Sequence, residues 1–204
     1  MDIVSREFYN RDSIIVAKEL LGKFLVHESK GYKLVSRIVE TEAYMGVIDK
    51  AAHSYGGRRT KRVEVMYGKP GFSYVYLIYG MYNCLNIVAN QEGIPHCVLI
   101  RGVEPIEGID IMANNRYNKA YDQLTRSQKI GLTNGPGKLC MALDIDRNHN
   151  GLDVCGDELY VQEGDNEAFD VVSAKRIGID YAEEARDFLW RFYIKDNKYV
   201  SVKI

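Results

Sequence analysis

The sequence has little of what marks several common classes of protein. It contains 1 Trp and 4 Pro among 204 residues, and we find no internal repeat, low-complexity tract or linker rich in Pro and Ser. No apolar run approaches the roughly 18 residues needed to cross a bilayer. The first segment, MDIVSREFYNRD, is polar and lacks the apolar centre of a signal peptide. We therefore expect a single domain over residues 1–204, located in the cytoplasm and with no membrane partner.

Neither sign of charge dominates, and cysteine is sparse. The 27 Lys and Arg and the 28 Asp and Glu leave a net charge of −1. This balance argues against a protein held to nucleic acid by global positive charge, although a local basic patch is compatible with it. The 4 cysteines form no Cys-x-x-Cys pair, so neither a zinc ribbon nor a thioredoxin-type site is expected. Because histidine and cysteine are scattered, we predict reduced thiols, no metal requirement and no cofactor.

Hydrophobic patterns predict strands at both ends of the chain and helices in the middle. Asp12 or Ser13 is expected to cap a helix over 14–21 that ends at Gly22, and Pro105 to begin a helix over 105–116. This order lacks the regular alternation of a parallel sheet. We therefore predict a mixed α/β (α+β) fold with a curved, mostly antiparallel β-sheet and helices packed on it. A short helix or turn is expected over 49–55. Further short helices are expected over 122–130, 138–143 and 181–188, and strands over 24–28, 33–44, 73–80, 82–90, 96–105, 158–164, 169–179, 191–195 and 199–204.

Two glutamates and a tyrosine alternate in the segment VETEAY. On a strand, Glu40, Glu42 and Tyr44 project to one face, and acidic side chains are unusual in an otherwise apolar strand. This face could be solvated, or a glutamate could pair with Arg37 or Arg101. The functional interpretation is a carboxylate at the edge of a pocket, placed to take a proton from water.

A histidine and a basic loop follow. A lone histidine such as His53 is more often structural or exposed than functional, and a basic run such as RRTKR at 58–62 is more often a solvated face. The adjacent Gly56-Gly57 favours another interpretation. Such a loop lets backbone amides approach a phosphate while Arg and Lys neutralise its charge.

Tyrosine is abundant, with 15 copies, and many of them fall in the segment YVYLIYGMY at 74–82. Tyrosine suits sheets, so this segment could simply be a strand rich in tyrosine. However, Tyr79 lies beside Gly80, where a ring at a turn could project outward as a wedge between base pairs. Tyr76 would then face a pocket and hold an extruded base.

Two polar residues interrupt apolar strands. Asn86 lies in CLNIV and Arg101 in VLIRG, and buried polar groups need partners. Arg101 could pair structurally with Glu42 or Glu104. The same pairing at a catalytic pocket would hold a carboxylate ionised and a water oriented.

Taken together, these segments resemble the alkyladenine (3-methyladenine) DNA glycosylase family. The matching stretches are RIVETEAY, AAHSYGGRRTKR, YGKPG, YVYLIYGMYNCLNI, VLIRGVEPIEG and NGPGKLCMAL, spread from about residue 15 to near the C-terminus. The resemblance implies a monomer with a single mixed α/β domain, whose partner is duplex DNA containing damaged purines.

The resemblance also implies roles for individual residues. Glu42 matches the general base, Arg101 an arginine that positions the attacking water, and the backbone carbonyl of Ile177 a further contact to that water. The remaining matches are Tyr44, His53 and Tyr76 around the flipped base, Asn86 as the asparagine that crowds the amino group of guanine, Tyr79 as the side chain inserted into the duplex, and Arg58, Met66, Tyr82 and Lys138 as contacts to the DNA backbone.

These assignments predict a monofunctional DNA glycosylase of base excision repair. It would flip alkylated or deaminated purines out of the duplex and hydrolyse the N-glycosidic bond to leave an abasic site. The motifs supply no lysine or terminal amine as nucleophile, so we expect no Schiff base and no lyase activity. Two alternatives are a carbohydrate or nucleoside hydrolase that uses Glu40 and Glu42 as a carboxylate pair, and a non-catalytic module that stacks bases on its tyrosines.

Overall fold

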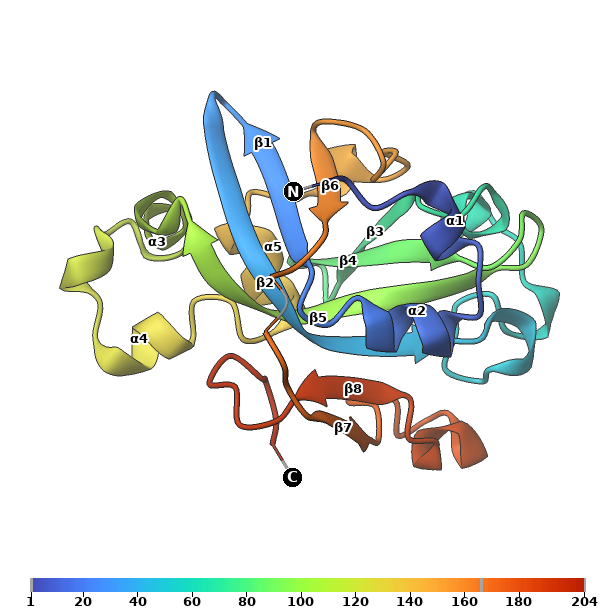
Figure 1. Cartoon of the computed structure of the whole chain (residues 1–204). Coiled ribbons are helices and arrows are strands. Elements are labelled where there is room, and N and C mark those ends of the chain that lie inside the picture. The colour runs from blue at the N-terminus through green and yellow to red at the C-terminus, as the bar shows by residue number, and fades with distance from the viewer. Residues whose placement is uncertain (1, 166, 204) are drawn as a thin grey trace.

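A curved antiparallel β-sheet organises the chain in the computed structural model, which describes residues 2–165 and 167–203 (Figure 1). The strand order is β3-β4-β5-β2-β1-β6, while β8 pairs with both β2 and β7. This arrangement confirms the predicted α+β fold with a mostly antiparallel sheet. The strands are β1 Phe24–Ser29, β2 Tyr32–Tyr44, β3 Ser73–Ile78, β4 Tyr82–Ala89, β5 His96–Glu107, β6 Leu159–Gln162, β7 Val171–Ala174 and β8 Arg191–Ile194.

The central strand β2 has neighbours along both edges. It pairs with β5 on one side, and on the other side first with β1 and then, from Glu40 to Glu42, with β8. The side chains of Glu40, Thr41 and Glu42 are therefore fully buried. Such burial requires that both carboxylates have partners, because an unpaired buried charge is costly.

The described ranges contain five α-helices, of which α2 and α5 pack most extensively on the sheet. The helix α2 begins at the predicted cap, where the Asp12 side chain accepts a 2.8 Å hydrogen bond from the Ile14 amide. Helix α5 packs on β4 and β5, and α2 on β2 and β5. Figure 1 shows α3 and α4 beyond the end of β5, on the side away from α1 and α2. The bounds are α1 Arg6–Tyr9, α2 Ser13–Glu19, α3 Ile109–Tyr117, α4 Arg126–Ile130 and α5 Pro136–Ala142. Within the described ranges, no helix is both long and apolar enough to cross a membrane.

Two predicted elements differ from the structure. Pro105 lies within β5 and not at a helix start; it is opposite Ser36 beside a register shift, and α3 begins only after Gly108, which adopts a left-handed conformation. The predicted strand over 199–204 does not form within its described residues, 199–203. The reason is a tertiary contact, since the Ser201 amide donates to the Glu40 carboxylate at 2.8 Å instead of joining a strand ladder.

Candidate active site

A cavity of about 380 Å³ lies against β3, β4, β5 and the end of β2. Its volume is in the range typical of small-molecule sites. The structure brings eight of the predicted site residues into its wall. They are Tyr44, His53, Met66, Tyr76, Tyr79, Asn86, Arg101 and Ile177.

The aromatic part of the wall is held by a hydrogen-bonded ring cluster. His53 Nδ1 lies 2.8 Å from the Tyr74 hydroxyl, and its ring meets the Tyr76 ring edge-on, with centroids 4.6 Å apart at 78°. Burial, reinforced by Arg62 and Arg58, lowers the pKa of His53 to about 4. The imidazole is therefore neutral near pH 7 and does not repel a positively charged ligand.

Glu42 lies directly behind this wall. Its Oε2 accepts a 2.9 Å hydrogen bond from the Tyr44 hydroxyl, and its Oε1 accepts a 2.8 Å bond from the Ile177 amide. Arg101 adds an ion pair, with Nη1 3.4 Å from Oε1. Because a carboxylate has about four acceptor sites, these donors leave one free on Oε2. Burial and the charge of Glu42 raise the pKa of Tyr44, which keeps its hydroxyl protonated as a donor.

Glu40 has a different environment from Glu42. Arg191 donates to its Oε1 at 2.8 Å, the Ser201 amide donates to Oε2 at 2.8 Å, and Arg101 Nε lies 3.4 Å from Oε1. Of these three partners only Arg101 lines the cavity, whereas the two hydrogen-bond donors to Glu42, Tyr44 and Ile177, both line it. The geometry therefore disfavours a catalytic carboxylate pair formed by Glu40 and Glu42.

The turn between β3 and β4 presents Tyr79. Its ring is 79% exposed, and both Tyr79 and Gly80 have positive φ angles, 52° and 71°. The Met81 amide closes the turn on the Ile78 carbonyl at 3.2 Å. Two positive φ angles are the signature of a type I′ hairpin turn, in which a bulky tyrosine is unfavourable. The structure thus maintains an exposed aromatic ring at a strained position beside the cavity, which Tyr79 also lines.

Comparison with known proteins agrees with this geometry. A family model described as methylpurine-DNA glycosylase matches residues 7–198. This chain belongs to the methylpurine-DNA glycosylase family. It is 64% identical over 203 residues to the "Putative 3-methyladenine DNA glycosylase" of Desulfitobacterium hafniense (strain Y51), covering 100% of both chains. A protein of the same name from Clostridium acetobutylicum is 62% identical over 97% of this chain and 96% of its own, and one from Clostridium novyi (strain NT) is 58% identical over 100% of both.

Membership of this family implies a hydrolase of N-glycosidic bonds with a DNA substrate, and the cavity rim contains candidate DNA contacts. A second hollow of about 500 Å³ shares Tyr79 and Arg101 with the cavity and extends to Tyr82 and Lys138. Arg58 is exposed and lines a smaller hollow beside His53. These positions line hollows that share residues with the cavity.

Met66 does not fit its predicted contact with the DNA backbone. Its side chain is 1% exposed and lines the cavity, packed with Val63, Tyr74, Val88 and Cys97. It therefore shapes the cavity wall and does not face solvent.

Sequence reasoning missed Arg176, which fixes the position of Tyr44. Its guanidinium lies 4.7 Å from the Tyr44 ring centre and binds both carboxylate oxygens of Asp49, at 2.5 and 2.8 Å. Both side chains are fully buried. Arg176 directly precedes Ile177, which was assigned, but no local pattern indicates that it contacts residues 127 positions away.

Proposed function

We propose that this chain is a monofunctional DNA glycosylase that hydrolyses the N-glycosidic bond of alkylated and deaminated purines flipped out of duplex DNA. One observation carries the proposal. A buried carboxylate, Glu42, is hydrogen-bonded to two residues in the wall of a cavity lined by aromatic rings.

The cavity walls suit a flat, cationic guest. Tyr44, His53 and Tyr76 would hold the extruded purine, and stacking contributes roughly 1–3 kcal/mol per base. An alkylated purine carries positive charge, and attraction to an aromatic face adds roughly 0.5–2 kcal/mol. Asn86 is buried, and its amide is anchored by a 3.1 Å bond to the Tyr74 carbonyl. A fixed amide in this wall would crowd the exocyclic amino group of normal guanine.

Glu42 would act as the general base. The free acceptor site on its Oε2 would take a proton from water, and its charge would stabilise the oxocarbenium-like sugar. The Ile177 amide donates a hydrogen bond to this carboxylate, and Arg101 places a positive charge beside it. The carbonyl of Ile177 remains a predicted contact to the attacking water.

Tyr79 would occupy the gap left by the flipped nucleotide. An exposed ring on a strained turn at the cavity mouth is suited to insertion between base pairs. Damaged purines pair or stack poorly, so their extrusion costs less than that of normal bases. Arg58, Tyr82 and Lys138 would contact the DNA backbone on either side.

We expect direct hydrolysis. Among the described residues that line the cavity, none is a lysine that could form a Schiff base. The product would be an abasic site in an intact strand.

The test uses duplexes that carry 3-methyladenine, 7-methylguanine, hypoxanthine or ethenoadenine, incubated without added metal. We expect release of free base, strand breaks only after alkali, and no trapped adduct with borohydride. Release of base from free nucleosides but not from duplexes would overturn the proposal in favour of a nucleoside hydrolase. Binding to undamaged single strands with no base release would favour a stacking module.

A further inference from the structure

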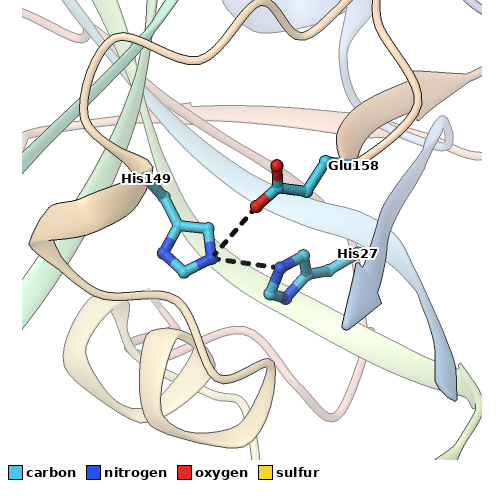
Figure 2. A group of neighbouring side chains, drawn as sticks. All are labelled: His27, His149 and Glu158. Atoms are coloured by element: carbon cyan, nitrogen blue, oxygen red, sulfur yellow. Dashed lines mark hydrogen bonds and ion pairs between the residues drawn. The ribbon is translucent and has the colours of Figure 1, made fainter. Parts of the chain in front are cut away.

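Two of the scattered histidines meet at a site remote from the cavity. His27 on β1 and His149 in the 3₁₀ turn Arg147–His149 place their Nε2 atoms 3.1 Å apart, although 122 residues separate them. Glu158, just before β6, adds Oε1 at 3.9 Å from His149 Nε2. Figure 2 shows the three side chains converging from separate segments. None of them lines the cavity of the proposed active site.

The orientation of His27 is fixed by its other nitrogen. His27 Nδ1 lies 2.6 Å from the carbonyl oxygen of Leu143. A carbonyl only accepts, so Nδ1 carries the proton and the Nε2 lone pair points at His149. A backbone carbonyl that binds the outer nitrogen is the arrangement that commonly orients a metal-binding histidine.

His149 can hold its proton on either nitrogen, because Asp146 presents two partners to Nδ1. The Asp146 amide is a donor at 3.1 Å, and the Asp146 Oδ1 is an acceptor at 3.0 Å. With the proton on Nε2, His149 donates to His27. With the proton on Nδ1, held by the Asp146 carboxylate, both Nε2 atoms are unprotonated and lie 3.1 Å apart. A cation within reach of both atoms would be bound by both lone pairs.

We propose that His27, His149 and Glu158 form a binding site for one Zn²⁺ ion, with water as the fourth ligand. In a tetrahedral site with Zn–N bonds of about 2.0–2.1 Å, two nitrogens lie about 3.3–3.4 Å apart. The observed separation of 3.1 Å requires little change. The third ligand atom is also near, since all three atoms lie within 4.8 Å of one another. Two imidazoles with one carboxylate are ligands that zinc prefers.

The surroundings favour a bound cation. His27 is 1% exposed, so this side of the site is shielded from solvent. Asp144, Asp146 and Glu158 provide negative charge around the pair. The Glu158 side chain is 57% exposed, which gives an ion a route from solvent.

Occupancy would reinforce strand β3. The Ser73 hydroxyl donates to the His149 carbonyl, and the Val75 amide donates to Asn150 Oδ1 at 2.9 Å. Strand β3 also carries Tyr76 and leads to Tyr79. The ion would thus stabilise the structure without taking part in the reaction. Base excision in the absence of metal is compatible with such a role.

The experiment titrates the full chain, stripped of metal with a chelator, with Zn²⁺ in competition with a chromophoric chelator. Co²⁺ serves as a second probe, because its visible absorption reports tetrahedral coordination. We expect one ion per chain and a rise in Tm of about 5–10 °C at a hundredfold excess of free Zn²⁺ over the dissociation constant. Amide exchange in β3 should slow on binding.

Three variants make the result specific. His149→Gln and Glu158→Gln remove a ligand from partly exposed positions and should weaken binding by about 10–100-fold or more. Asp157→Asn removes the same charge from the exposed neighbour of Glu158 and should bind like the unmodified chain. No stoichiometric binding by the unmodified chain, or equal binding by His149→Gln, would overturn the proposal. Either result is independent of base excision.

Discussion

The backbone amide of Ile177 donates a 2.8 Å hydrogen bond to Oε1 of Glu42, although 135 residues separate them in the chain. The bond joins the central strand β2 to the segment that follows β7. Since the Tyr44 hydroxyl holds the other oxygen, the carboxylate is fixed at both ends. Such preorganisation is what a general base needs to meet water in one geometry.

Replacing the Glu42 carboxylate should greatly slow base excision but leave binding to duplex DNA intact. Glu42→Gln keeps the shape but removes the base, so the single-turnover excision rate should fall by about 10²–10⁴-fold. The variant should still bind lesion-containing duplex, as measured by fluorescence anisotropy. Glu107→Gln, an exposed position at the end of β5, is the matched control. Excision at the unmodified rate by Glu42→Gln would contradict its role.

Changing the strained tyrosine should separate stability from base flipping. Tyr79→Asn installs a residue that tolerates positive φ, so the free energy of unfolding should rise by up to about 1 kcal/mol. The wedge is lost, and the fluorescence of ethenoadenine in a duplex should report less flipped base.

A second hairpin provides the control for this variant. Lys30 and Gly31 form the β1–β2 turn with the same pattern of φ angles, 52° and 78°. Lys30→Asn should leave the flipping equilibrium unchanged. An unaltered equilibrium in Tyr79→Asn as well would argue against insertion of Tyr79.

Stability should depend on pH through His53. Its pKa is lowered to about 4, mainly by burial, from an ordinary value of 6.5. Between these values the unfolded chain binds more protons than the folded one, so the free energy of unfolding decreases as the pH falls from 6.5 towards 4.

Urea unfolding at several pH values in this window measures the effect. His53→Gln should show a smaller decrease than the unmodified chain. Tyr74→Phe removes the hydroxyl 2.8 Å from His53 but preserves burial, the main cause, and should keep most of the dependence. Identical slopes for His53→Gln and the unmodified chain would exclude His53 as a source.

The buried pair behind Tyr44 should be sensitive to loss of one partner. Arg176→Met leaves Asp49 buried and uncompensated, and we expect the free energy of unfolding to fall by about 3–5 kcal/mol. Adding Asp49→Asn removes the unpaired carboxylate charge and should restore part of the lost free energy of unfolding. Chemical denaturation measures both variants.

The adjacent pair offers a control in a different environment. Lys175 and Asp187 lie 2.6 Å apart, but both side chains are more than half exposed. Lys175→Met should therefore cost no more than about 1 kcal/mol. Equal losses in the two variants would contradict the importance of burial.

Local sequence predicted most elements and many of the cavity residues. The Asp12 cap, the strand periodicity and the glycines at the hairpin turns act over a few residues, so a single sequence reveals them. The failures are tertiary in origin. Ser201 bonds to Glu40 instead of forming a strand, and Met66 is buried in the cavity wall.

By itself, the sequence determined the set of chemical groups: a carboxylate in an apolar strand, a histidine, a run of tyrosines and two polar residues within strands. Only the tertiary structure decided how they are used. The register of β2 against β5 and β8 places Glu40 where Arg191 and Ser201 donate hydrogen bonds to it. The same register places Glu42 beside the cavity. It also brought His27 to His149. Which buried charges pair depends on how close segments far apart in the sequence come to one another, and only the folded sheet determines this.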